Sequence, residues 1–229
     1  MYTNPAPDLR IAVGTCFDDN YMHISRVITL LFLTALMACN QASEKPPQRD
    51  PEAKALNDSA FKILMKSTND SDYQKAIGLL DKAIAIDSTY VGAYRKKVSL
   101  ETLLKQYDKA LATSKKLNEL RPANPNFMLT TGILYEKNGD TISSVNYFQK
   151  ALPLYDKTLD TMSLKNPDRF ALTMNKGITF ILLNEPGKGN DILKALYDKQ
   201  TDLKYKEYLI PLMNKPRKNV VDYLTLEQK

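Results

Sequence analysis

The sequence predicts an all-α fold, a solenoid of antiparallel helix pairs, and two observations carry this prediction. Apolar residues recur at steps of three and four along most of the 229-residue chain, which is the spacing of one helix face. The same pattern returns every 34 residues, and each unit holds two such runs separated by a turn. Because one helix pair cannot bury its apolar face alone, we expect the pairs to stack along the chain.

Three regular units span residues 57–90, 91–124 and 125–158. Their best preserved column holds a small side chain in the second apolar run, followed each time by an aliphatic residue: Ala76, Ala110 and Ser144, then Ile77, Leu111 and Val145. The turn of the third unit reads Lys-Asn-Gly-Asp at 137–140, a sequence that favours chain reversal. Each unit is therefore predicted to form one helix, a turn and a second helix.

This pattern resembles the tetratricopeptide repeat, a family of 34-residue helix pairs. Residues 73–77 and 107–111 look like the start of that family's second helix, and residues 131–135 look like the middle of its first helix. Three family positions are each matched only once, by the bulky Tyr94, by Gly132 and by Pro122. The resemblance implies a right-handed superhelix with small residues where the helices cross and a concave groove lined by the first helix of each unit.

A degenerate fourth unit is predicted at residues 170–203, after an insertion of 11 residues. The correspondence lies in two pairs of small residues that stand 45 positions apart: Gly132 with Gly177, and Ser144 with Gly189. Asn-Glu-Pro-Gly at 184–187 provides the turn between its helices. The fold class is thus an α-solenoid of three regular repeats and one degenerate repeat.

The insertion and the C-terminus complete the predicted helices. The insertion is expected to lengthen the second helix of the third unit toward Met162, with Pro153 as the place for a kink. Two further apolar segments, 203–213 and 219–226, are expected to form capping helices within residues 203–226. A solenoid needs such helices to cover its last apolar face.

Residues 1–38 are predicted to be an N-terminal extension followed by a signal peptide. An uncharged apolar run at 27–36 follows Arg26 and is far shorter than the roughly 20 residues that cross a bilayer. Residues 36–39, Leu-Met-Ala-Cys, resemble the lipobox of bacterial lipoproteins. That resemblance implies cleavage before Cys39 and acyl chains on its thiol and new amino terminus, and two or three chains suffice for stable anchoring.

The sequence also predicts where translation starts before this signal peptide and which residues form a tether after it. Residues 1–21 carry three acids, one base and two prolines, unlike the basic start of a signal peptide, so translation is predicted to begin at Met22. Residues 39–52 are predicted to be the lipidated cysteine and a disordered tether, because three prolines stand among polar residues. The helical domain then covers residues 53–229.

The sequence offers little for catalysis or metal binding. It has two cysteines and one histidine, and both Cys16 and His23 precede the predicted cleavage site. The processed chain would therefore lack His-dependent triads, a free nucleophilic thiol and Cys/His zinc sites. The Gly-Lys-Gly at 187–189 is too short for a phosphate-binding loop. We predict no enzyme activity, no cofactor and no metal site, and a hidden pair of catalytic carboxylates is the alternative.

The resemblance also implies which side chains would line the groove. They come from the first helix of each regular unit: Phe61, Met65, Arg95, Ser99, Leu103, Leu129, Ile133 and Glu136. For Phe61, Met65 and Ile133, packing in the core is the alternative reading. The basic clamp with which some family members hold chaperone C-terminal tails is not matched, apart from Arg95. We expect a hydrophobic helix or an extended segment as the ligand.

The basic charge of the chain is unevenly distributed. The formal charge is +6 and the pI about 9.1, and residues 91–124 alone hold eight bases and three acids, a net charge of +5. Such a surface would suit an acidic partner or anionic lipid headgroups, and lysines solvated on several helix faces are the alternative. Nucleic acid is not an expected partner of an exported lipoprotein.

These features predict a membrane-anchored lipoprotein that acts as a protein–protein interaction adaptor in the cell envelope. Asn40 and Gln41 after Cys39 lack the aspartate that marks inner-membrane retention in enteric bacteria, which favours lipid anchoring to the outer membrane. The expected partner is an envelope protein or peptide segment, and the leaflet and the oligomeric state stay open. The alternatives are an immunity-type lipoprotein that sequesters a toxic effector and a carboxylate-dependent envelope hydrolase.

Overall fold

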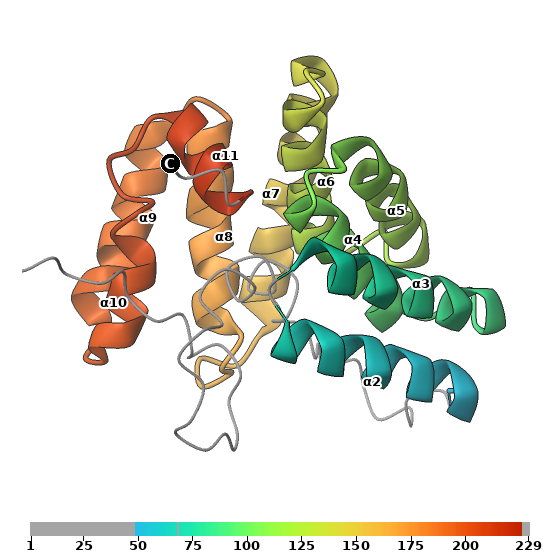
Figure 1. Ribbon diagram of the computed structural model, residues 1–229. Coiled ribbons are helices and arrows are strands. Elements are labelled where there is room, and N and C mark those ends of the chain that lie inside the picture. The colour runs from blue at the N-terminus through green and yellow to red at the C-terminus, as the bar shows by residue number, and fades with distance from the viewer. Residues whose placement is uncertain (1–48, 68, 226–229) are drawn as a thin grey trace, which may run out of the picture.

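The computed structural model describes residues 49–67 and 69–225, and all regular secondary structure in these ranges is helical (Figure 1). Ten helices follow one another in these ranges: α2 (Pro51–Lys66), α3 (Asp70–Ile86), α4 (Val91–Leu103), α5 (Tyr107–Leu120), α6 (Pro125–Lys137), α7 (Thr141–Thr161), α8 (Arg169–Leu182), α9 (Pro186–Lys199), α10 (Leu203–Leu209) and α11 (Arg217–Leu224). The first eight form four antiparallel pairs, and α10 and α11 follow the last pair. The predicted all-α class is confirmed.

The pairs stack in sequence order. Each second helix packs on the first helix of the next pair, so that α3 contacts α4, α5 contacts α6 and α7 contacts α8. First helices also touch across pairs, α2 with α4 and α6 with α8, which places them on the inner side of the stack. In Figure 1 the pair α2–α3 runs across the view whereas α8–α9 stands upright, so the pairs rotate along the chain as in a superhelical solenoid.

The turns inside the pairs repeat at the level of the backbone. Lys105, Gly139 and Asn184 each adopt a positive φ (56°, 82° and 61°) just after a first helix, and they stand 34 and 45 positions apart. An equivalent backbone hydrogen bond forms in each turn: Gln106 N donates to Glu101 O (2.8 Å), Asp140 N to Tyr135 O (2.9 Å) and Glu185 N to Phe180 O (2.9 Å). This is the usual left-handed helix ending, and its spacing shows that the fourth pair follows the same plan after an insertion.

Small residues allow the two helices of a pair to approach closely. A Cβ atom added to Gly132 would lie 2.4 Å from Phe148 Cε1, and one added to Gly189 would lie 2.6 Å from the carbonyl oxygen of Gly177. Both glycines lie in columns of buried residues that recur through the pairs: Leu64, Val98, Gly132 and Gly177 in the first helices, and Ala76, Ala110, Ser144 and Gly189 in the second. The small-residue column therefore marks the places where the helices cross.

The insertion lengthens α7, as predicted. This helix has 21 residues against 14 in α5 and includes Pro153 in its interior. Its C-terminal carbonyl groups are bound by Arg169, whose Nη1 donates to Leu159 O at 2.7 Å and to Met162 O at 2.9 Å. The remaining inserted residues form the loop from α7 to α8.

The structure corrects two boundaries. The first helix in the described residues is α2, which begins at Pro51, and the side chain of Asp50 caps this helix by accepting from the amides of Glu52 (2.8 Å) and Ala53 (3.2 Å). Residues 51 and 52, predicted as tether, are therefore helical, because aspartate followed by proline is a strong helix start. At the other end, α10 is shorter than the predicted segment 203–213, and α11 begins two residues before the predicted segment 219–226. The predicted signal peptide, Met22, Cys39 and residues 40–48 lie outside the described residues.

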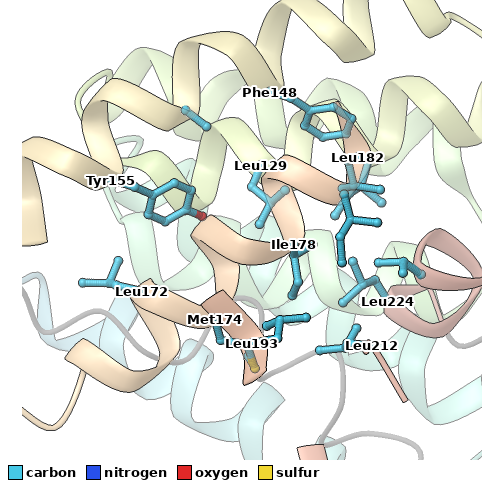
Figure 2. Packing of buried hydrophobic residues seen from close by; sticks show 14 of the residues in the cluster. Leu129, Phe148, Tyr155, Leu172, Met174, Ile178, Leu182, Leu193, Leu212 and Leu224 are labelled. Atoms are coloured by element: carbon cyan, nitrogen blue, oxygen red, sulfur yellow. The ribbon is translucent and has the colours of Figure 1, made fainter. Parts of the chain in front are cut away.

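The core is divided into clusters that follow the stacking. The largest joins α6 through α11, and Figure 2 shows Phe148 and Leu182 on one side of it and Leu212 and Leu224 on the other. Tyr155 is fully buried there, and its hydroxyl donates to Asn126 Oδ1 at 2.6 Å. Because α10 and α11 contribute buried leucines and valines to this cluster, both helices cover the apolar end of the last pair.

One carboxyl group is buried between α3, α4 and α5. Glu101 is 2% exposed, and its Oε1 lies 3.8 Å from Lys97 Nζ, which is itself closer to Asp81 (2.5 Å). Its Oε2 has no hydrogen-bond partner among the described residues. Burial raises the pKa of Glu101 above its usual 4.5, so the folded protein binds this proton at a higher pH than the unfolded chain.

Replacing Glu101 by glutamine is expected to stabilise the protein near neutral pH by about 1 kcal/mol, since the cost of burying the charge disappears. Ionised Glu101 lowers stability above its folded pKa, and that loss is recovered as the pH falls toward 4.5. Urea unfolding between pH 4.5 and 8 should therefore show the Glu101→Gln advantage shrinking at low pH. The exposed Asp191→Asn should show no such trend, and a pH-independent Glu101→Gln effect would contradict the argument.

Candidate protein-binding face

The eight side chains predicted to line a groove all lie on first helices. Phe61 and Met65 belong to α2, Arg95, Ser99 and Leu103 to α4, and Leu129, Ile133 and Glu136 to α6. Because first helices contact one another across the pairs, the structure gathers these positions on one side of the domain, which we call the first-helix face. The exposure of these eight side chains differs strongly along the first-helix face.

Three of the eight side chains are buried. Leu129 and Ile133 belong to the largest core cluster, together with Phe148 and Ile178, and Ser99 is buried on α4. For Ile133 the alternative reading as a core residue is therefore the right one, and the assignment of Leu129 and Ser99 to an open groove is corrected in the same way. At these positions the neighbouring helices leave no surface for a partner.

Glu136 is engaged by the C-terminal helix. Arg217 of α11 donates from Nε to Oε1 at 3.1 Å and from Nη2 to Oε2 at 2.5 Å, and Ser144 Oγ donates to Oε2 at 2.9 Å. Beside this pair, Lys137 Nζ lies 3.4 Å from Asp222 Oδ1 of the same helix. The predicted groove residue Glu136 therefore holds α11 in place and is a structural contact.

The more open part of the first-helix face lies on α2 and α4, where Phe61, Arg95 and Lys96, together with the buried Asn57, form what we call the α2–α4 patch. Lys96 Nζ donates to Asn57 Oδ1 at 3.0 Å and lies 5.6 Å from the centre of the Phe61 ring. Phe61, Arg95 and Lys96 are all partly exposed. The sequence interpretation missed Lys96, although its position next to Arg95 on the same turn was the available signal.

The α2–α4 patch is cationic and incompletely neutralised. Burial lowers the pKa of Arg95 to about 10, against the opposing attraction of Asp168. Burial, followed by repulsion from Arg95, lowers the pKa of Lys96 to about 8. Arg95 Nε is buried and has no hydrogen-bond acceptor among the described residues. An anionic group placed beside Arg95 and Lys96 would relieve the repulsion between the two cations.

The other bases of residues 91–124 are spread over several faces of α4 and α5. Lys97 pairs with Asp81 at 2.5 Å, Lys116 pairs with Glu119 at 2.6 Å, and Lys115 Nζ lies 4.9 Å from the centre of the Tyr135 ring. Three of the bases of this unit are therefore engaged by neighbouring side chains.

The described part of the chain shows neither a membrane-spanning helix nor a metal-ligand cluster. In residues 49–67 and 69–225 no helix combines the length and the apolar character that a membrane span requires. The same residues contain no group of three or more histidine, cysteine, aspartate or glutamate side chains placed to hold a metal ion.

Comparison with known proteins adds sequence and structural neighbours, although no protein-family model matches the chain. Human tetratricopeptide repeat protein 28 is 26% identical over 135 residues, which are 55% of this chain but only 5% of that protein. The crystal structure of PilW, described as a widely conserved type IV pilus biogenesis factor, has a TM-score of 0.50 and 19% identity, covering 79% of this chain and 80% of PilW.

A second solved structure is more distant. MamA from Desulfovibrio magneticus RS-1, from residue 41 to its end, has a TM-score of 0.44 and 17% identity over 64% of this chain and 74% of MamA. Four stacked helix pairs, a 34-residue period seen in both side chains and turns, and similarity to PilW and to a tetratricopeptide-repeat protein show that the chain has the fold of a tetratricopeptide-repeat solenoid.

Proposed function

We propose that this protein is a membrane-anchored lipoprotein that serves as a protein–protein interaction adaptor of the cell envelope, and that it binds its partner on the α2–α4 patch. The observation that carries the proposal is the pair of partly exposed cations Arg95 and Lys96 beside the partly exposed Phe61. A helix-pair solenoid binds ligands along its inner face, and this is the part of that face that α11 and the core leave accessible.

The patch favours a partner segment that combines an apolar and an acidic side chain. Phe61 offers apolar area, and an aromatic residue next to an arginine is the usual composition of a binding hot spot. A carboxylate beside the partly exposed side chains of Arg95 and Lys96 would gain a charge-assisted contact in partly desolvated surroundings. The ligand expected from the sequence is a hydrophobic segment, and the patch adds the expectation that this segment also carries an acidic side chain.

The membrane anchor in this proposal is Cys39. The lipobox at residues 36–39 supports it, and so does the short distance in sequence from Cys39 to the cap of α2 at Asp50. An acylated Cys39 would hold the domain at the outer membrane, facing either the periplasm or the cell surface. PilW, whose fold is similar, acts in pilus biogenesis, and assembly of an envelope structure is one setting in which such an adaptor would work.

The proposal is tested by cross-linking in intact cells of the organism that makes the protein. The tagged full chain would be compared with Phe61→Ala, Arg95→Gln and the control Lys62→Gln, an exposed lysine next to Phe61 in sequence. We expect the first two variants to bind the cross-linked partner about tenfold more weakly and the control to bind it normally. A partner list that is unchanged in both patch variants, with helicity preserved by circular dichroism, would overturn the assignment.

A further inference from the structure

The last described helix, α11, lies on two first helices of the solenoid. It contacts α8, and its Arg217 and Asp222 reach Glu136 and Lys137, the last two residues of α6. In Figure 1 the dark red α11 stands beside α8, on the side that faces α6. The surface of α6 and α8 that α11 covers, with Glu136 and Lys137 as its charged residues, is called the α11 site below.

The buried residues of α11 follow the spacing of one helix face. Val220, Val221 and Leu224 are buried and belong to the largest core cluster, in which Figure 2 shows Leu224. They stand three, four and seven positions after Arg217, which pairs with Glu136. Anchors at exactly these spacings are used when a groove recognises an amphipathic helix. The α11 site therefore holds α11 in the way that a helix-binding surface holds a peptide.

The charged residues of the α11 site define the start of the helix that lies on it. Arg217, in the first turn of α11, donates to Glu136 from two nitrogen atoms, and its guanidinium carbon lies 5.9 Å from the centre of the Phe148 ring. A cation in the first turn of a helix opposes the helix dipole. The arginine is therefore placed to meet Glu136, since α11 gains nothing from it as an isolated helix. A forked guanidinium matches this carboxylate better than a lysine would.

The helical state of α11 depends on its contacts with the α11 site. The helix has eight residues and is about 12 Å long. Isolated helices of this length are not stable in water. Pro216 at its N-cap provides no side-chain hydrogen bond to the first turn. Release from the α11 site is therefore expected to unwind α11.

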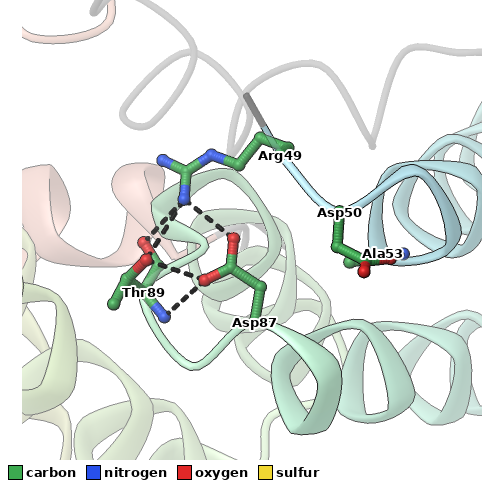
Figure 3. Close-up of polar contacts among 5 residues, drawn as sticks. All are labelled: Arg49, Asp50, Ala53, Asp87 and Thr89. Atoms are coloured by element: carbon green, nitrogen blue, oxygen red, sulfur yellow. Dashed lines mark hydrogen bonds and ion pairs between the residues drawn. The ribbon is translucent and has the colours of Figure 1, made fainter. Parts of the chain in front are cut away.

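The other end of the described chain is fastened within a helix pair. Arg49 Nη1 donates to Asp87 Oδ2 at 2.9 Å and to Thr89 Oγ1 at 3.2 Å, so the residue before the cap of α2 is tied to the loop between α3 and α4 (Figure 3). Helix α2 has 16 residues, is capped by Asp50 and packs on α3. In contrast, α11 follows the last pair, so its release leaves all four pairs assembled.

We propose that the α11 site is a helix-binding surface that α11 closes from within, and that its protein partner presents an amphipathic helix in which an arginine is followed by apolar residues three, four and seven positions later. Such a helix would pair with Glu136 and take the places of Val220, Val221 and Leu224. The α11 site shares no residue with the α2–α4 patch, so this proposal stands apart from the function proposed above.

The tether gives α11 an advantage over any free helix. A linked segment competes for its site at an effective concentration of roughly millimolar. A partner helix therefore displaces α11 only when it binds the α11 site more tightly than the free α11 segment does. In this way α11 excludes weakly matching helices.

The test lets a free peptide compete with a loosened α11. In the full chain, Arg217→Glu places a second carboxylate opposite Glu136, which should release α11 and open the α11 site. A fluorescent peptide with the sequence of residues 214–225 is added, and its binding is measured by anisotropy. We expect it to bind the Arg217→Glu chain at least roughly tenfold more tightly than the parent chain, where the tethered α11 competes. The control Lys215→Glu, at an exposed lysine just before α11, should behave like the parent.

An exchange of charges identifies the contact that the peptide makes. The Glu136→Arg chain should also release α11, but it should bind the native peptide at least roughly tenfold more weakly than the Arg217→Glu chain does, because two arginines would meet. It should instead bind the peptide that carries Arg217→Glu. A peptide with Val220→Asp and Leu224→Asp should bind neither chain, because its apolar anchors are lost.

Hydrogen exchange of the α11 amides shows whether the α11 site has opened in the Arg217→Glu chain. A native peptide that fails to bind the opened chain, or that binds both charge-reversed chains equally, would overturn the proposal. Amides of α11 that stay protected in Arg217→Glu would also overturn it, and so would a loss of helicity in the other helices. In either case α11 would be a fixed part of the core.

Discussion

Replacing Gly189 by alanine is expected to destabilise the protein by about 3 kcal/mol, a large share of the stability of a domain of this size. The added Cβ would lie 2.5 Å from Ile181 Cγ1 and 2.6 Å from the carbonyl oxygen of Gly177, well inside contact distance. The carbonyl belongs to the backbone of α8, so it can move away only if α8 and α9 separate. Urea unfolding followed by circular dichroism measures the loss.

Two other glycines provide the controls for this prediction. Gly187 lies two residues earlier on α9, Gly78 lies inside α3, and a Cβ atom at either one would have no neighbour within 4 Å. Alanine there should leave stability unchanged or raise it by up to about 1 kcal/mol, because glycine is a poor helix former. If Gly189→Ala behaved like Gly187→Ala, the close crossing of α8 and α9 would be contradicted.

The importance of Gly189 could be read from the sequence because it depends on a local pattern. The small-residue column Ala76, Ala110 and Ser144 continues to Gly189 once the 11-residue shift is allowed, and a helix crossing needs a small residue whatever surrounds it. Helix pairs, turns and the lengthened α7 were predictable for the same reason: apolar spacing and turn residues act within a few positions. The start of α2 was misjudged because three nearby prolines suggested a tether, although Asp50 and Pro51 already form a helix cap.

The candidate binding face was less predictable, because its accessibility depends on contacts far along the chain. The repeat pattern places Leu129, Ile133 and Glu136 on a first helix, and they lie on α6. The repeat pattern does not predict that Leu129 and Ile133 become part of a core shared with α8 and α11. Nor does it predict that Glu136 pairs with Arg217, which lies 81 positions later in the sequence. Lys96 was overlooked for a related reason, since its neighbours Asn57 and Phe61 come from another repeat.

Removing the Glu136 carboxylate is expected to destabilise the protein by about 2 kcal/mol and to loosen α11. The two side chains are 21% and 16% exposed, so Glu136→Ala leaves the Arg217 guanidinium partly desolvated without its bidentate partner. Loss of one member of a fully buried pair costs roughly 3–5 kcal/mol, and the partial exposure here reduces that figure. The apolar face of α11, with Val220 and Leu224, stays available for packing, so global unfolding is not expected.

Hydrogen exchange locates this effect, since the amides of α11 should lose protection in Glu136→Ala while those of α4 and α5 keep it. A double-mutant cycle with Arg217→Ala should give a coupling energy above about 1 kcal/mol, because each single variant breaks the same bidentate contact. The control is Lys218→Ala, whose partner Asp222 lies 3.3 Å away but whose side chain is 86% exposed, and its effect should stay below about 0.5 kcal/mol. Additive effects of Glu136→Ala and Arg217→Ala would mean that α11 is held by its valines and leucine alone, and that the carboxylate could be released to a partner without cost.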